Sequence, residues 1–118
     1  MYHLKAVSRC VFAAGAIAVV ILSLLPGADL PSLGVSDKIE HMAAYAAISL
    51  AGAAAFPTRG GALLLLVLLP SLGIGLEIAQ LAVPGRSSEV ADAVADSAGV
   101  AAVLLPILLL RTASSGVR

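Results

Sequence analysis

Charged residues are scarce in this chain. Only 12% of the 118 residues are charged, whereas 60% are hydrophobic. Average soluble proteins are about a quarter charged, and a domain this small leaves much of its chain exposed. A water-soluble globule is therefore excluded. An intrinsically disordered chain is excluded as well, because disorder requires low hydrophobicity.

Cysteine, aromatic residues and an excess of basic residues are also missing. The chain has one cysteine, no tryptophan, two phenylalanines and two tyrosines, and its acidic and basic residues balance at seven each. A disulfide scaffold needs several cysteines, and nucleic-acid binding needs a basic patch with stacking aromatic side chains. We expect no nucleic-acid partner. The partner that remains is the lipid bilayer.

Four stretches with few or no charged residues are present, and they predict membrane helices. A bilayer core about 30 Å thick is crossed by roughly 20 helical residues. The fold class predicted is therefore all-α, a polytopic transmembrane bundle that forms one domain over residues 1–118. The four predicted helices cover about 6–25, 37–56, 61–83 and 88–110.

The first and last of these predicted helices differ from a plain apolar span. Lys5 and Arg9 precede the first apolar run, so a cleaved signal peptide is the alternative to a first membrane helix. The last charge-free stretch, 97–110, is too short to span a bilayer alone. We therefore expect the fourth helix to include Asp92 and Asp96.

The charges are segregated along the predicted topology. Basic residues concentrate on cytoplasmic loops of membrane proteins. With both termini cytoplasmic, only Lys38 and Arg86 lie outside, and the five basic residues inside are Lys5, Arg9, Arg59, Arg111 and Arg118. The acidic residues all lie toward the outer face: Asp29, Asp37, Glu40, Glu77, Glu89, Asp92 and Asp96. Because acidic residues contribute little to membrane insertion, this segregation predicts an extracytoplasmic polar site.

Small residues recur at helical spacing on two of the predicted helices. In the second helix they are Ala43, Ala47, Ala51 and Ala55, and in the fourth they are Ala91, Ala95 and Gly99. Small side chains let helix backbones approach closely in a membrane. We expect these stripes to be packing faces, the alternative being chance in an alanine-rich chain.

The second predicted helix carries three polar residues on one face. Asp37, His41 and Tyr45 are spaced i, i+4 and i+8. An aspartate one turn from a histidine can orient the imidazole, as it does in general bases and metal ligands. Ser36 suits the helix N-cap, so the alternative role of Asp37 is only to favour the start of the helix.

An acidic residue, Glu77, lies inside the third predicted helix. An ionisable side chain there is costly unless it faces the bundle interior, a partner or a water-filled cavity. Gln80 shares its face, and Gly73 and Gly75 would let a ligand or another backbone come close. The alternative is that Glu77 pairs with Arg86 or is protonated.

A proline-glycine turn, 84–85, precedes Arg86 and the start of the fourth helix. Ser87 and Ser88 are candidate caps of that helix. A guanidinium beside a helix N-terminus suits a phosphate or carboxylate, although Arg86 could instead neutralise the acidic face. The candidate ligand-binding residues are Lys38, Tyr45, Gln80, Arg86, Ser87 and Asp96.

These residues, in this order, resemble the VanZ-like family of small bacterial membrane proteins. The resemblance covers about residues 36–104, and the matching residues are Asp37, Lys38, His41, Tyr45, Glu77, Gln80, Pro84, Gly85, Arg86, Ser87, Asp92 and Gly99. The family usually has Asn where this chain has Asp96. The resemblance implies a multi-pass protein of the bacterial inner membrane. It also implies a link to teicoplanin resistance, by a mechanism not established as enzymatic.

Three classes of function fit this pattern. The first is an envelope protein whose outer polar site binds a lipid headgroup or a cell-wall precursor. The second is a membrane-embedded enzyme acting on a lipid-linked or peptide substrate, with His41 as general base oriented by Asp37, and with Glu77 and Asp92 as acid, base or metal ligands. The third is a proton-coupled transporter or channel, which four short helices could form only as a homo-oligomer.

Known catalytic and metal-binding motifs are missing from the sequence. The paired histidines of zinc motifs and the G-x-S-x-G of hydrolases do not occur, and the single cysteine, Cys10, lies at the cytoplasmic start of the first helix. We therefore predict no cofactor and leave the presence of a metal open.

Overall fold

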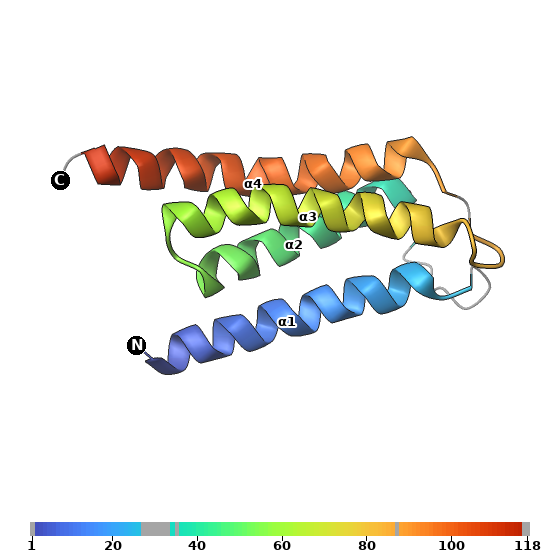
Figure 1. Ribbon diagram of the computed structural model, residues 1–118, viewed down its shortest axis with the longest axis horizontal. Coiled ribbons are helices and arrows are strands. Elements are labelled where there is room, and N and C mark those ends of the chain that lie inside the picture. The colour runs from blue at the N-terminus through green and yellow to red at the C-terminus, as the bar shows by residue number, and fades with distance from the viewer. Residues whose placement is uncertain (1, 27–33, 35, 87, 117–118) are drawn as a thin grey trace.

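The structure is a computed structural model that describes residues 2–26, 34, 36–86 and 88–116 (Figure 1). These residues form four α-helices: α1 Tyr2–Leu24, α2 Asp37–Ala55, α3 Arg59–Gln80 and α4 Val90–Gly116. The predicted all-α class with four helices is confirmed. The residues used in the predictions that lie outside the described ranges are Asp29, Ser87 and Arg118.

Side-chain caps begin two of the helices. The Ser36 hydroxyl oxygen accepts the backbone N–H of Ile39 at the start of α2, at 3.3 Å. The Thr58 hydroxyl oxygen accepts the backbone N–H of Gly61 at the start of α3, at 2.9 Å. Each cap satisfies an N–H group that has no partner within its helix.

The observed bounds of α3 and α4 differ from the predicted ones at the turn between the two helices. Helix α3 ends at Gln80 rather than at 83, and the chain turns through Gly85, whose φ of 72° favours glycine. Helix α4 begins at Val90 and continues to Gly116. It therefore includes Asp92 and Asp96, as the short charge-free stretch predicted.

Three of the helices are long and apolar enough to cross a membrane. They are α1, α3 and the segment Val90–Ala113 of α4. Helix α2 falls short because its first turn carries Asp37, Lys38 and Glu40. Length and composition together indicate a membrane protein.

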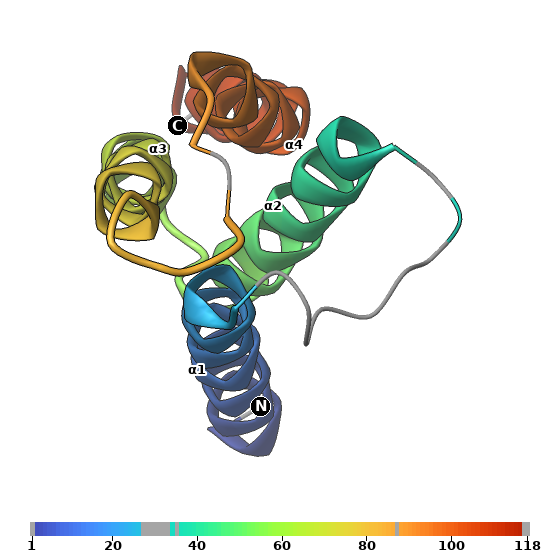
Figure 2. The same cartoon turned by 90° about the vertical axis from the view of Figure 1, so that its right-hand side faces the viewer.

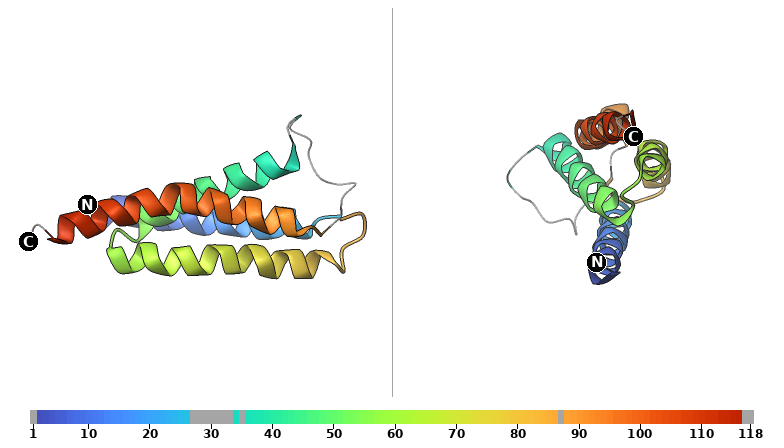
Figure 3. Two further views of the ribbon diagram at one scale, coloured as in Figure 1. Left: turned by 90° about the horizontal axis from the view of Figure 1, so that it is seen from above. Right: turned by 90° about the vertical axis from the view of Figure 1, so that its left-hand side faces the viewer.

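Helix α2 occupies the centre of the bundle. It packs against α1, α3 and α4, whereas α1 contacts α2 and α3 (Figure 2). The start of α1 and the end of α4 lie at one end of the bundle (Figures 1 and 3). The start of α2, the end of α3 and the start of α4 meet at the opposite end, where the predicted polar residues lie.

The closest helix contact joins α2 and α4. A Cβ atom added to Gly99 would collide with the carbonyl oxygen of Met42 and would lie 3.2 Å from the backbone nitrogen of Ala46. Only glycine at position 99 lets the backbones of α2 and α4 approach this closely. The contact places the residues one turn before Gly99 directly opposite the first turns of α2.

The predicted alanine stripe on α2 is confirmed in part. Ala55 is buried and Ala51 is half-buried, whereas Ala43 and Ala47 are exposed. Helix α2 also packs through larger side chains such as Tyr45 and Ile48. The stripe on α4 is confirmed in part, because Ala95 and Gly99 are buried while Ala91 is exposed. The core cluster comprises Tyr45, Ile48, Ala53, Leu65, Leu69, Val100 and Leu104.

Candidate functional site

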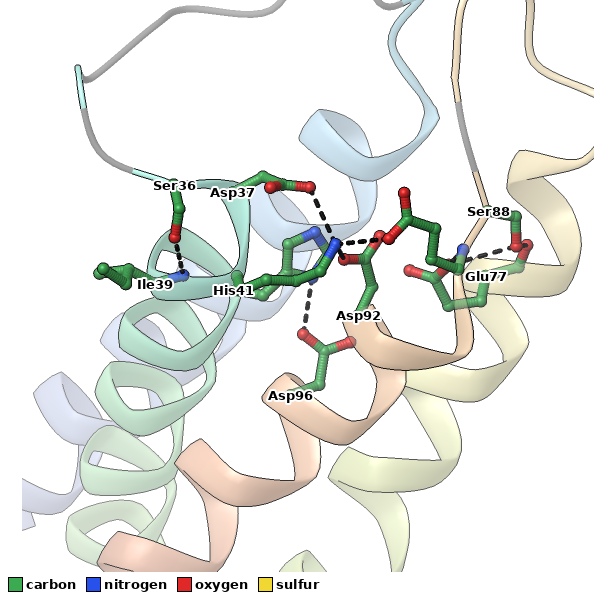
Figure 4. A network of polar contacts seen from close by, with 10 residues as sticks. Ser36, Asp37, Ile39, His41, Glu77, Ser88, Asp92 and Asp96 are labelled. Carbon is green, nitrogen blue, oxygen red and sulfur yellow. Dashed lines mark hydrogen bonds and ion pairs between the residues drawn. The ribbon is translucent and has the colours of Figure 1, made fainter.

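Polar side chains from α2, α3 and α4 gather at the end of the bundle opposite to the chain termini (Figure 4). We call this group the polar cluster, and its members are Asp37, Lys38, His41, Glu77, Ser88, Glu89, Asp92 and Asp96. Three of its carboxylates belong to buried residues, namely Glu77, Asp92 and Asp96. The cluster therefore places several acidic groups where each needs a compensating partner.

Lys38 is the centre of one half of the polar cluster. Its ammonium group lies 2.6 Å from Asp92 Oδ1, 2.8 Å from Glu89 Oε2 and 3.3 Å from Asp37 Oδ2. The carboxylates of Asp92 and Glu89 raise the pKa of Lys38, whose charged form donates to both. In turn, the hydrogen bond from Lys38 lowers the pKa of Asp37. Lys38 thus compensates Asp92, which is almost fully buried.

His41 is paired with Asp96 and not with its predicted partner. Nδ1 of His41 lies 2.7 Å from Oδ1 of Asp96, which is 1% exposed. Asp37 bonds to Lys38 instead, so the prediction that Asp37 orients His41 is wrong. The reason is the close contact at Gly99, which brings the preceding turn of α4 against the first turns of α2.

Glu77 ties the end of α3 to the start of α4. Its Oε2 accepts the backbone N–H of Glu89 at 3.1 Å and the hydroxyl of Ser88 at 3.2 Å, and its carbonyl oxygen accepts the same hydroxyl at 2.7 Å. A carboxylate at a helix N-terminus is favoured by the helix dipole. The predicted cap role of Ser88 is wrong, because its hydroxyl donates to Glu77. Within the described ranges, Glu77 forms no pair with Arg86.

Two predicted site residues lie at the edge of the polar cluster or away from it. Tyr45 is 3% exposed and lies one turn below His41. Gln80 points to α1, where its Nε2 donates to the carbonyl oxygen of Ser23 at 3.0 Å. Gln80 therefore joins α3 to α1. Its Oε1 is buried and has no partner among the described residues.

Arg86 is half-buried, and its backbone N–H donates to the carbonyl oxygen of Val83 at 3.3 Å. Its side chain forms no hydrogen bond or ion pair with any residue that the structure describes. Its guanidinium therefore remains able to bind an anionic group. Ser87, the neighbouring candidate, lies outside the described ranges.

Glu89 was missed among the predicted site residues. It directly precedes α4, donates its backbone N–H to Glu77 and accepts from Lys38 through its side chain. Its position after two serines at a predicted helix start was the available signal. Only the folded structure shows that Lys38, 51 residues away, reaches it.

An apolar groove of about 760 Å³ runs between α3 and α4 and ends at the polar cluster. Its apolar wall includes Ile74, Ile78, Leu81, Val90 and Val94, and its polar end includes Glu77, Ser88 and Glu89. Both helices are long and apolar enough to span a membrane. The wall of the groove is therefore apolar along α3 and α4 and polar where it reaches the cluster.

The polar cluster offers two kinds of chemistry. The His41–Asp96 pair has the arrangement of an imidazole oriented by a carboxylate. Ligand atoms of His41, Glu77 and Asp96 also lie within 4.8 Å of one another, so these three residues could hold a metal ion.

No protein-family model, curated protein or solved structure matches this chain.

Proposed function

We propose that the chain is a VanZ-like, multi-pass protein of the bacterial inner membrane. In this proposal its extracytoplasmic polar cluster binds the headgroup of a lipid or of a lipid-linked cell-wall precursor. The observation that carries the proposal is the continuity of an apolar groove, between two candidate membrane helices, with a partly buried polar cluster at its end. The resemblance of residues 36–104 to the VanZ-like family supports the same assignment. Binding a cell-wall precursor would lower the access of a glycopeptide antibiotic to it.

The distribution of basic residues supports the proposed orientation. Lys5, Arg9, Arg59 and Arg111 all lie toward the end of the bundle that holds the start of α1 and the end of α4. Basic residues concentrate on the cytoplasmic side of membrane proteins. This distribution supports cytoplasmic termini, an extracytoplasmic polar cluster and α2 as a fourth span that is sheltered by the other helices.

The orientation is tested by cysteine labelling. Cys10 is first changed to serine, and a single cysteine is then placed at Leu81 or Ala113, two exposed positions near opposite ends of the bundle. In intact spheroplasts, we expect a membrane-impermeant maleimide to label Leu81→Cys and to spare Ala113→Cys until the membrane is broken. The reverse pattern would contradict the proposed orientation.

A headgroup with an anionic part fits the charges that the cluster leaves available. The guanidinium of Arg86 has no partner in the described part of the chain, and arginine grips phosphate with two hydrogen bonds. The carboxylates of Glu77 and Glu89 at the end of the groove can accept hydrogen bonds from sugar hydroxyls or amines. A phosphate-linked sugar or amino sugar on a long hydrocarbon chain combines both requirements.

Binding is tested with a fluorescent polyprenyl phosphate and the purified full chain in detergent. Arg86→Gln is expected to weaken binding by roughly tenfold or more, since tenfold corresponds to about 1.4 kcal/mol. Ala98→Phe fills the groove and is expected to reduce binding, whereas Ala54→Phe, at an exposed position on α2 outside the groove, leaves it unchanged. We expect His41→Gln to retain more binding than Arg86→Gln. Equal and complete loss in both would contradict the proposal.

A membrane-embedded hydrolase or transferase is the second candidate. The observation that favours it is the 2.7 Å contact between His41 and Asp96, with Glu77 close by. Such a base could activate water or a hydroxyl group at the membrane surface. Incubation of the purified protein with lipid-linked substrates, with and without a chelator, would reveal turnover that His41→Ala or Glu77→Gln abolishes. A lack of turnover across those substrates would weigh against an enzyme.

A further inference from the structure

Three side chains within the polar cluster converge from three different helices. His41 comes from α2, Glu77 from α3 and Asp96 from α4, and one potential ligand atom of each lies within 4.8 Å of the other two. Glu77 and Asp96 are 7% and 1% exposed, so this convergence is buried inside the bundle. Buried carboxylates are retained only where a cation, a proton or hydrogen bonds compensate them.

The protein supplies too little positive charge at this point. The ammonium group of Lys38 already forms ion pairs with three carboxylates of the polar cluster, those of Asp37, Glu89 and Asp92. Among the described residues, the side chain that contacts the Asp96 carboxylate is His41. Glu77 and Asp96 are therefore two buried carboxylates that lie close together and share, at most, the charge of one imidazole.

Each of these carboxylates has an oxygen without a protein partner. The side-chain hydrogen bonds of Glu77 use Oε2, and the contact of Asp96 with His41 uses Oδ1. Oε1 of Glu77 and Oδ2 of Asp96 have no hydrogen-bond partner within the part of the chain that the structure describes. Oδ2 of Asp96 lies over Gly73, 2.8 Å from where a Cβ atom would be. Both free oxygens belong to side chains that are more than nine-tenths buried.

We propose that His41, Glu77 and Asp96 bind a divalent cation. One imidazole nitrogen with two carboxylate oxygens suits Zn²⁺ or Mn²⁺, and the absence of a thiolate disfavours softer ions. Metal bonds of roughly 2.0–2.2 Å place two ligand atoms of a tetrahedral ion roughly 3.3–3.6 Å apart. His41 Nδ1 and Asp96 Oδ1 are 2.7 Å apart, so a shift of about 0.6–0.9 Å lets an ion replace the proton between them. Three protein ligands leave a coordination position open for water or for an anionic ligand.

The cation site uses residues of the proposed headgroup site but does not depend on headgroup binding. In the proposed function, Arg86 and the groove between α3 and α4 hold the lipid. Here His41, Glu77 and Asp96 hold the ion, whether or not a lipid is present. A phosphate placed at the open position of the ion would join the two sites.

The test uses the purified full chain in detergent after removal of metals with a chelator. Isothermal titration with ZnCl₂ and with MnCl₂ is expected to show one strong site per chain for at least one of the ions. Titration with CoCl₂ is expected to give the visible absorption of a protein-bound Co²⁺ ion. We expect His41→Gln and Asp96→Asn to weaken binding by roughly 10–100-fold or more.

Matched variants distinguish metal binding at this site from nonspecific binding of cations to acidic residues elsewhere on the protein. Glu77→Gln removes a proposed ligand, whereas Glu40→Gln makes the same change at a residue of α2 that has no ion pair among the described residues. Glu40→Gln is expected to retain metal binding. In Gly73→Ala the new methyl group would press against the Asp96 carboxylate and should weaken metal binding. In Gly75→Ala the new methyl group would meet no other atom within 4 Å, so metal binding should be unchanged. Circular dichroism and size-exclusion chromatography check that each variant is folded.

Two results would overturn the cation site. One is the absence of Zn²⁺ and Mn²⁺ binding to the folded wild-type chain. The other is binding that His41→Gln, Glu77→Gln and Asp96→Asn leave unchanged, because the ion would then lie elsewhere. Polyprenyl phosphate binding to the chelator-treated protein, compared between wild type and Arg86→Gln, reports on the proposed function separately.

Discussion

Nδ1 of His41 lies 2.7 Å from Oδ1 of Asp96, although 55 positions separate the two residues in the chain. The contact joins α2 to α4 at the level where the bundle changes from an apolar core to the polar cluster. Because Asp96 is 1% exposed, the pair also holds a buried carboxylate in place. Stability, metal binding and any proton transfer at this end of the molecule therefore depend on the same contact.

Loss of this contact is expected to destabilise the bundle. Asp96→Asn keeps the size of the side chain but removes its charge, and a hydrogen bond to a charged group contributes about 1.5–3 kcal/mol. We expect a lower midpoint of thermal unfolding in detergent, followed by circular dichroism. Asp37→Asn is the control, because the side chain of Asp37 is 63% exposed and does not contact His41. Equal destabilisation by both variants would contradict the assigned pairing.

The contact between Gly99 and Met42 is expected to tolerate no side chain. In Gly99→Ala the new methyl group would collide with the carbonyl oxygen of Met42, and overpacking of this kind costs typically about 1–3 kcal/mol. Gly60→Ala, also in a helix, has open space at the same atom and should leave the unfolding midpoint nearly unchanged. A Gly99→Ala variant as stable as the Gly60→Ala variant would show that α2 and α4 do not approach as described.

Arg111 is expected to stabilise the other end of the bundle. Its guanidinium donates to the carbonyl oxygens of Ala53, Phe56 and Thr58, at 2.8, 3.1 and 2.8 Å, and so caps the end of α2 from α4. Arg111→Gln should lower the free energy of unfolding by about 1–3 kcal/mol, since each charge-assisted bond contributes more than a neutral one. Arg59→Gln, which loses one exposed bond to Thr112, should cost less. Urea titration of both variants measures the difference.

Lys38 is expected to stabilise the protein over a defined pH range. Its pKa is raised in the folded state, so its contribution is fully present below the ordinary lysine pKa of about 10.4 and is lost as the pH rises through the folded-state value. The unfolding midpoint of Lys38→Gln should therefore lie below that of the wild type by a constant amount between about pH 7 and pH 9. The difference should shrink at more alkaline pH.

The control for this pH series is Lys5→Gln, because Lys5 is exposed and lies near the start of α1, at the opposite end of the bundle. Its unfolding midpoint should follow that of the wild type throughout. A gap between Lys38→Gln and wild type that widened above the ordinary lysine pKa would contradict the assigned ion pairs.

Composition and periodicity predicted the helices well because they depend on local properties. Stretches with few charges predicted four membrane helices, of which three are long and apolar enough to span a membrane. Ser36 suited a helix N-cap, and the short charge-free stretch required α4 to include Asp92 and Asp96. The same patterns placed the acidic residues of α2, α3 and α4 at one end of the helices. Each of these inferences follows from spacing along one helix or from the length of one segment.

Pairing between helices could not be read from the sequence. Asp37 is one turn from His41 and was its expected partner, yet its carboxylate bonds to the neighbouring Lys38, and the approach at Gly99 presents Asp96 to His41 instead. The i, i+3 spacing puts Gln80 on the same face of α3 as Glu77, but the amide of Gln80 donates to the carbonyl oxygen of Ser23 in α1. The alanine stripe of α2 contributes Ala55 to the buried face, but the core cluster contains Tyr45 and Ile48 rather than Ala43 and Ala47.

The sequence by itself determined that this is a helical membrane protein with its acidic residues at one end, because composition and helical period are properties of single segments. Which acid meets His41, which one holds Lys38 and which side chains converge on a buried cation site were decided only by tertiary structure. The relative rotation and depth of α2, α3 and α4 depend on close packing at a few small residues such as Gly73 and Gly99.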